Sequence, residues 1–326
     1  MLTLLAVLTF QAPLFQADTP LVFSLETDLR TLLRDRGDER VEHDAILRLA
    51  SGDTLDVELR TRGIFRLKQC SFPPLRLDVP RSRAGGTPFA GQDKLKLVTH
   101  CRGDRSSERN LLREYAVYRA YNAITDSSFR ARLARVTYID TARADTVTRY
   151  AIVLEADEEL ARRLGAEVVD SDVLHDVLMQ PEQMTTAAMF QYLIGNTDWS
   201  VWKRHNIEIL RDTARGGGAL LAIPYDFDFS GAVSASYARP PAQLPIRSVR
   251  DRLYRGFCQP DSLVLRVIER FRARKDAVYA AVSAVPWPEP DDARELLDYF
   301  DGFYRAIEDE GRVRREFLRG CRQPPQ

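Results

Sequence analysis

The spacing of apolar and polar residues predicts that the first half of the chain is built mainly from β-strands. Residues 45–49 and 55–60 alternate on either side of residues 51–53 (Ser-Gly-Asp), and this arrangement predicts a hairpin. Residues 73–79 and 94–98 alternate in the same way, so each is expected to be a strand with one buried face.

The same half contains one longer segment with helical spacing. Between residues 108 and 124 the apolar side chains recur every three or four positions, which predicts an amphipathic helix. Two further strands are expected at residues 134–140 and 149–155, and a short helix is expected at 157–164.

The second half is predicted to be mainly helical. Pro181 suits the first turn of a helix that runs to Ile194, and Gly195 suits the end of that helix. The other elements expected here are a hairpin and two helices, at residues 207–210 with 219–223, 263–282 and 292–307.

The order of these elements predicts the fold class. Strands dominate up to about residue 155 and helices dominate after it. We therefore expect an α+β protein with two lobes, a strand-rich N-lobe over residues 18–156 and a helix-rich C-lobe over residues 157–326. This order of parts is that of a protein kinase-like fold.

The overall charge argues against two classes of partner. The 326-residue chain has 44% hydrophobic and 29% charged residues, which is typical of a folded globular protein. Lys and Arg number 47, as do Asp and Glu, so no broad electrostatic attraction to nucleic acid or to acidic membranes is expected.

The first residues predict export. Residues 1–15 carry no charge and are rich in apolar side chains, but they are too few to span a membrane. We interpret residues 1–17 as a signal peptide with Ala17 before the cleavage point, which places the protein in the periplasm or outside the cell. The alternative is a first core strand or helix. No later segment is expected to cross a membrane.

Four cysteines support the same compartment. Their spacing matches no zinc-binding pattern, and an even number in an exported chain favours disulfides. Of the three possible connectivities we predict Cys70 with Cys101 and Cys258 with Cys321. Four buried free thiols remain the alternative.

Two groups of polar residues are the main indication of chemistry. Asp198 and Asn206 follow the helix that ends near residue 195, and Asp226 and Asp228 follow a predicted strand. Alternate residues of an extended segment share a face, so Asp226 and Asp228 are expected side by side. Because Mg²⁺ binds carboxylates together with substrate phosphates, we predict Asp198 as a catalytic base and the other three as metal ligands.

A phosphotransfer site also needs a cation for the phosphates and a carboxylate that holds this cation. Lys96, with Lys94 beside it on one face of a predicted strand, is the first candidate, and Arg76 on the preceding strand is the second. Glu114 in the predicted helix is the candidate carboxylate. The implied cofactors are ATP with Mg²⁺ or Mn²⁺.

Three segments resemble the CotH-type kinases, an atypical family of mostly secreted or spore-coat protein kinases. They are Arg60-Thr61-Arg62-Gly63, Gly195-Asn196-Thr197-Asp198-Trp199 and Pro224-Tyr225-Asp226-Phe227-Asp228. Over most of residues 55–321 the chain is also similar to a group of uncharacterised secreted bacterial proteins. The resemblance implies a kinase-like fold, ATP with a divalent metal, and a protein acceptor with a Ser or Thr hydroxyl.

Other features favour different interpretations. Asp198 and Asn206 are eight positions apart, more than kinase catalytic loops usually have, and no Gly-x-Gly-x-x-Gly loop occurs. A secreted module without catalysis that binds a metal, a glycan or a protein partner is therefore the alternative function. A metal-dependent phosphoesterase is a third. Asp198 as a simple turn cap and Lys96 as part of a solvated strand face are the structural alternatives.

Overall fold

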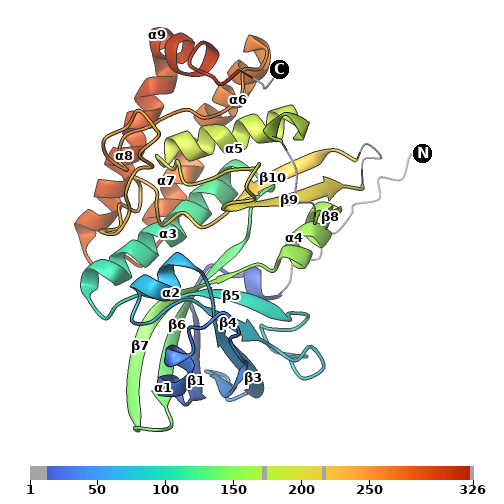
Figure 1. Cartoon of the computed structure of the whole chain (residues 1–326), viewed down its shortest axis with the longest axis vertical. Helices are drawn as coiled ribbons and strands as arrows, with labels where there is room; N and C mark the ends of the chain where they lie inside the picture. Colours follow the sequence, from blue (N-terminus) through green and yellow to red (C-terminus); the bar gives the residue numbers. More distant parts are fainter. Residues whose placement is uncertain (1–12, 171–174, 215–217, 324–326) are drawn as a thin grey trace.

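A closed β-barrel forms one end of the molecule. The computed structural model describes residues 13–170, 175–214 and 218–323 (Figure 1). The strands of the barrel are β1 (Leu21–Thr27), β2 (His43–Leu49), β3 (Thr54–Thr61), β4 (Leu75–Asp78), β5 (Lys94–Val98), β6 (Ala131–Asp140) and β7 (Asp145–Leu154). Around the barrel their order is β1-β2-β3-β4-β5-β7-β6.

The barrel is closed by a pairing between strands that are far apart in the sequence. β1 runs parallel to β6, with Leu25 opposite Tyr138, whereas the other neighbouring strands of the barrel are antiparallel. Alternate residues of each strand point inward, so Leu25, Leu47 and Leu59 are fully buried in one apolar cluster. Burial of these apolar side chains is the main stabilising term for the barrel.

Helices and a small sheet form the rest of the molecule. The three-stranded antiparallel sheet has the order β10-β9-β8, from β8 (Ala166–Val168), β9 (Ile207–Asp212) and β10 (Leu220–Pro224). The α-helices are α1 (Leu29–Arg34), α2 (Phe65–Gln69), α3 (Arg105–Ile124), α4 (Asp157–Leu164), α5 (Pro181–Leu193), α6 (Asp261–Ala273), α7 (Lys275–Ser283), α8 (Pro290–Glu308) and α9 (Glu310–Arg312). Shorter turns are η1 (Pro13–Phe15), η2 (Asp176–Leu178) and the π-helical η3 (Val313–Leu318).

Helix α3 joins the barrel to the helical half. Asp104 caps its first turn by accepting a hydrogen bond from the backbone N–H of Ser107, at 2.9 Å. The helix contacts α7 on one side and β6 and β7 on another (Figure 1). Its buried residues, such as Leu112 and Tyr118, belong to the same apolar cluster as α5, α6 and α8.

The predicted fold class is wrong. In place of a two-lobed protein kinase-like fold with a strand-rich N-lobe and a helix-rich C-lobe, the chain forms a closed, mixed, seven-stranded barrel with helices packed against it. The order of elements along the chain was predicted well, but that order does not determine which strands pair. The parallel β1–β6 pairing closes the barrel.

Most individual elements agree with the sequence-based expectations. The strands expected at 45–49, 55–60 and 94–98 and the helix expected at 157–164 are confirmed. The helix expected at 263–282 is wrong as one element, because α6 ends at Ala273 and α7 begins at Lys275. The elements that were not predicted include β1, α1, α2 and β8.

Both disulfides pair as predicted. Cys70 is bonded to Cys101, and Cys258 is bonded to Cys321. Among the described residues, no helix combines the length and the apolar character needed to cross a membrane. Most of the predicted signal peptide, residues 1–12, lies outside the described residues, while Leu14 and Phe15 in η1 are buried.

Candidate active site

A cavity of about 440 Å³ lies where one end of the barrel meets α3 and the loops after α5 and β10. Five of the seven predicted site residues line this cavity, namely Glu114, Asp198, Asn206, Asp226 and Asp228. They come from three separate parts of the chain, one helix and two loops. The fold therefore brings together carboxylates that are far apart in the sequence.

Arg66, which the sequence analysis missed, lies at the centre of these carboxylates. Its Nε donates to Asp228 Oδ2 at 2.7 Å, and its Nη2 donates to Glu114 Oε2 at 2.6 Å. The same Nη2 lies 3.4 Å from Asp226 Oδ1. We call Arg66, Glu114, Asp226 and Asp228 the Arg66 cluster. Arg66 comes from the short helix α2, just after the Arg-Gly segment that the sequence analysis had singled out.

The Arg66 cluster carries more negative than positive charge. One guanidinium faces three carboxylates, and the side chains of Arg66, Glu114 and Asp228 are at most 10% exposed. Buried charges are costly without partners, so the excess must be relieved by protons or by a bound cation. Asp226 differs from the other two carboxylates because its side chain is 44% exposed and lines the cavity. A ligand in the cavity can therefore reach Asp226.

The pKa shifts within the cluster follow from burial and from these contacts. Burial raises the pKa of Glu114, and the ion pair with Arg66 offsets only part of this rise. Burial also opposes ionisation of Asp228, but the ion pair with Arg66 and the hydrogen bonds from Arg66 and Tyr237 lower its pKa. The protein atoms around the half-buried Asp226 carboxylate remove part of its hydration, and this desolvation and the nearby Asp228 carboxylate raise the pKa of Asp226. Asp226 and Glu114 are thus the groups that hold a proton most readily.

Asp198 is held by two residues of its own loop. Asn206 Nδ2 donates to the backbone carbonyl of Asp198 at 2.8 Å and to Asp198 Oδ2 at 3.1 Å. His205 Nε2 lies 3.0 Å from Asp198 Oδ1, and this hydrogen bond raises the pKa of His205. The long Asp-to-Asn spacing is accommodated by a tight turn in which Ser200 and His205 exchange backbone hydrogen bonds.

Strained backbone is concentrated at this cavity. Six non-glycine residues of the described part have a positive φ, and three of them line the cavity: Arg204 at 46°, Asn206 at 54° and Asp226 at 58°. Such conformations are costly for residues other than glycine and often mark functional sites. The left-handed Asp226 also corrects a prediction, because the segment after β10 is not extended and Asp226 and Asp228 do not share a strand face.

The two predicted phosphate-binding cations lie elsewhere. Arg76 on β4 forms an ion pair with Glu42, and Lys96 on β5 forms one with Asp157 at 2.6 Å. Neither of them lines the cavity. Lys96 nevertheless lies near it, because its Nζ is 4.9 Å from the ring centre of Tyr225, a residue of the cavity wall.

Other arginines supply the positive charge of the cavity. Arg62 and Arg204 line it together with Arg66. Within the described residues the Arg62 side chain forms no hydrogen bond or ion pair, so its guanidinium is available to an anion. Arg204 forms ion pairs with Asp170 and Glu208. Arg62 could have been found from the sequence, because the segment Arg60-Thr61-Arg62-Gly63 was part of the resemblance. No role was predicted for this residue.

The donors in the cavity fit a divalent cation only in part. Asp226 offers a reachable carboxylate, and the amide oxygen of Asn206 is not used by the hydrogen bonds to Asp198. In the described part of the chain, no three or more His, Cys, Asp or Glu side chains are grouped to hold a metal ion. Mg²⁺ often binds through one or two carboxylates plus phosphates and water, and Asp226 with Asn206 satisfies that smaller requirement.

Comparisons with known proteins do not identify a family. No protein-family model matches the chain, and a search of curated proteins finds no match.

Proposed function

We propose that this protein is an exported phosphotransferase that uses ATP with Mg²⁺ or Mn²⁺ to phosphorylate a Ser or Thr hydroxyl of a protein. The observation that carries the proposal is the convergence of Asp198, Asn206, Asp226 and Arg62 in one cavity of about 440 Å³. This volume lies within the range of small-molecule sites. A site of this kind needs positioned charges more than covalent chemistry.

The lining of the cavity offers groups for both parts of a nucleotide. Pro74, Val98 and Leu154 are apolar, and the same cavity is also lined by acidic and basic side chains. Arg62 and Arg204 would hold phosphate oxygens through charge-assisted hydrogen bonds. Asp226 and Asn206 would hold the divalent cation, which would neutralise phosphate charge when bound.

Asp198 would act on the acceptor. In the proposed reaction the acceptor oxygen forms a bond to the terminal phosphorus of ATP. The bond between that phosphorus and the bridging oxygen breaks, and ADP leaves with the electron pair. The acceptor proton passes to the Asp198 carboxylate. His205 and Asn206 hold this carboxylate in one orientation through their hydrogen bonds.

The two disulfides support the compartment in this proposal. Disulfides persist in oxidising compartments and are rare in the cytosol of most organisms. Together with the apolar first residues of the sequence, they favour an exported protein.

A second candidate function is a binding module without catalysis. It is favoured by Arg66, which already neutralises part of the charge of Asp228 and Glu114, and by Lys96, which is bound to Asp157 outside the cavity. Such a module would bind an anionic or metal-bound ligand at Arg62 and Asp226 without turnover.

The test begins with binding. Thermal melts with ATP plus Mn²⁺ should raise the melting temperature by about 2–4 °C, since ligands that bind only the folded state stabilise it. Asp226→Ala should abolish this rise. Asp44→Ala should preserve it, because Asp44 is exposed on β2 and does not line the cavity. No rise with any pairing of nucleotide and divalent metal would refute the phosphotransferase.

The second step separates turnover from binding alone. Transfer of labelled terminal phosphate from ATP to a Ser/Thr peptide library should occur with the native protein. Asp198→Asn should reduce transfer by about 10²-fold or more while leaving the ATP-dependent rise in melting temperature in place. Binding of ATP without transfer to the library or to water would favour the binding module. Release of phosphate from simple esters without ATP would favour a phosphoesterase.

A further inference from the structure

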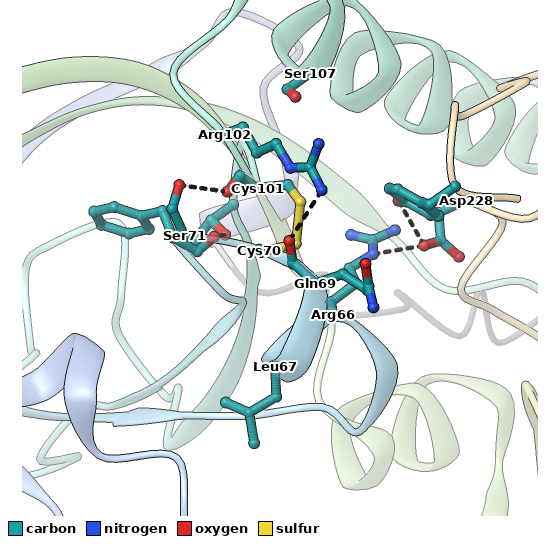
Figure 2. The surroundings of a disulfide bond; sticks show 12 residues. Arg66, Leu67, Gln69, Cys70, Ser71, Cys101, Arg102, Ser107 and Asp228 are labelled. Carbon is teal, nitrogen blue, oxygen red and sulfur yellow. Dashed lines mark hydrogen bonds and ion pairs between the residues drawn. A yellow bond between two sulfur atoms is a disulfide. The ribbon is translucent and has the colours of Figure 1, made fainter.

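A second, much smaller cavity shares three residues with the Arg66 cluster. It has a volume of about 20 Å³, room for a single occupant the size of water, and Arg66, Glu114 and Asp228 form part of its wall. We call it the rear chamber. Figure 2 shows Arg66 directed at Asp228, with Ser107 of α3 and the Cys70–Cys101 disulfide nearby. Ser107 and Cys101 also line the rear chamber.

Each of the three hydroxyl groups that line the rear chamber already donates its proton in a hydrogen bond to another group of the protein. Thr99 donates to the carbonyl of Phe72, and Ser107 donates to Asp104. Tyr237 donates to Asp228 at 2.8 Å. A hydroxyl has one proton and two lone pairs, so each of these three groups can offer an occupant only lone pairs.

Glu114 adds an unpartnered oxygen. Its side chain is 3% exposed, and Oε2 accepts a hydrogen bond from Arg66. Oε1 is buried and has no hydrogen-bond partner. Buried polar atoms are almost always satisfied, so an exception calls for an explanation such as a bound ion or water. Glu114 lines the rear chamber as well as the larger cavity, and the rear chamber, whose hydroxyl groups offer lone pairs, can supply the space for such a partner.

We propose that the rear chamber is a binding site for one dehydrated alkali-metal cation, Na⁺ or K⁺. Its ligands would be Glu114 Oε1, the hydroxyl oxygens of Thr99 and Ser107, and the side-chain oxygen of Asn110. The bound cation relieves part of the charge excess of the Arg66 cluster, in which three carboxylates face one guanidinium.

The charge of the Arg66 cluster and the small volume of the rear chamber favour an alkali-metal cation over a water molecule or Mg²⁺. A water molecule would satisfy Glu114 but would leave the charge excess to be relieved by protons on Asp226 or Glu114, whereas a bound cation relieves it without them. A Mg²⁺ ion keeps several of its water molecules, and a chamber of about 20 Å³ has no room for them. Arg66, Glu114 and Asp228 form part of the wall of both cavities, but the proposed nucleotide and divalent-metal site lies at Asp226, which lines only the larger one of the two.

The experiment compares salts in the absence of nucleotide and with EDTA present. At equal ionic strength, KCl or NaCl should give a melting temperature about 2–4 °C higher than tetramethylammonium chloride, whose cation is too large for the chamber. Two variants should remove this difference. Glu114→Gln removes the charged ligand, and Asn110→Leu fills the chamber with an apolar side chain while leaving Glu114 in place.

Controls separate the site from general salt effects. Glu58→Gln, at an exposed position on β3, should keep the full difference between salts. Crystals soaked in RbCl should show an anomalous peak beside Glu114. Equal melting temperatures in all three salts, or a difference that persists in both variants, would overturn the proposal. So would density in the chamber with no anomalous signal, because it would identify a water molecule.

The salt experiment contains no nucleotide and no free divalent metal. A negative result therefore rejects the alkali-metal site without rejecting the proposed phosphotransferase. The alkali-metal site can be absent while ATP and Mn²⁺ still stabilise the protein, and the reverse also holds.

Discussion

At the scale of single residues, Arg66 determines whether the carboxylates of the cavity can stay buried. Its guanidinium contacts Glu114, Asp226 and Asp228, and the first and last of these are almost inaccessible to solvent. An isolated buried carboxylate would take up a proton or draw in water. Arg66 is therefore as important for the shape of the cavity as the acidic residues that the sequence pointed to.

Replacing Arg66 should be costly for stability. Arg66→Met keeps the volume of the side chain but leaves two buried carboxylates without a cation, so the free energy of unfolding should fall by about 3–5 kcal/mol. Urea denaturation measures this loss. Arg83→Met is the matched control, because Arg83 pairs with Asp56 on the exposed surface, and it should cost at most about 1 kcal/mol. Equal losses in the two variants would show that the cluster contributes no special stability.

His100 should make the protein sensitive to acid. It is buried against Phe72 and near Tyr138, and burial, with the nearby charge of Arg149, lowers its pKa from 6.5 to about 4. Below pH 6.5 the unfolded chain binds a proton that the folded protein takes up only near pH 4. Stability should therefore decrease as the pH falls through this interval, by about 3 kcal/mol in total.

The variant His100→Phe isolates this contribution. Without a titrating group at this position, the loss of stability between pH 6.5 and about pH 4 should be smaller by the same amount, as measured by urea denaturation at a series of pH values. An unchanged acid dependence in the variant would assign the effect to other groups.

At the scale of elements, alternation and helical spacing predicted most strands and helices, because burial of one face is what these elements share. The short helix α2 could not be predicted in this way. It has five residues, Phe65–Gln69, and its position depends on the Cys70–Cys101 disulfide and on ion pairs with distant residues. Local sequence does not encode such contacts, and for this reason Arg66 was missed, while Lys96 and Arg76, which lie outside the cavity lining, were predicted as cations of the site.

The two disulfides should therefore differ in their effect on the cavity. Cys70 directly follows α2, and its bond to Cys101 fixes the end of the helix that carries Arg66 (Figure 2). Replacing both of these cysteines by Ala should lower the free energy of unfolding by about 2–4 kcal/mol and also weaken Mn²⁺-dependent ATP binding. The measurement combines urea denaturation with calorimetric titration.

The second disulfide provides a matched comparison. Cys258 and Cys321 join the end of the chain to the segment before α6 and do not line the cavity. Replacing both by Ala should lower the free energy of unfolding by a similar amount, roughly 2–4 kcal/mol, and leave ATP binding unchanged. Equal binding losses in the two double variants would mean that the first disulfide does not position Arg66.

At the scale of the whole molecule, β6 and β7 connect the two apolar clusters. Leu133 and Ile152 belong to the cluster that contains α3 and the C-terminal helices, whereas Ala134 and Val153, their neighbours in the chain, belong to the interior of the barrel. Because successive side chains of a strand point to opposite faces, the same two strands are part of both clusters. The order of elements could not predict this shared wall, and it is the reason why separate lobes are the wrong description.

The shared wall predicts that the barrel and the helical half unfold together. All three tryptophans, Trp199, Trp202 and Trp287, follow the barrel in the sequence, so their fluorescence reports only on the helical half. Leu25→Ala creates a cavity in the barrel, so the free energy of unfolding should fall by about 2–5 kcal/mol. In urea the fluorescence transition should shift by the same amount as the circular dichroism transition. Ser24→Ala on the same strand should shift neither the fluorescence transition nor the circular dichroism transition. If the fluorescence transition stays in place while circular dichroism gains an earlier phase, the two halves are independent units.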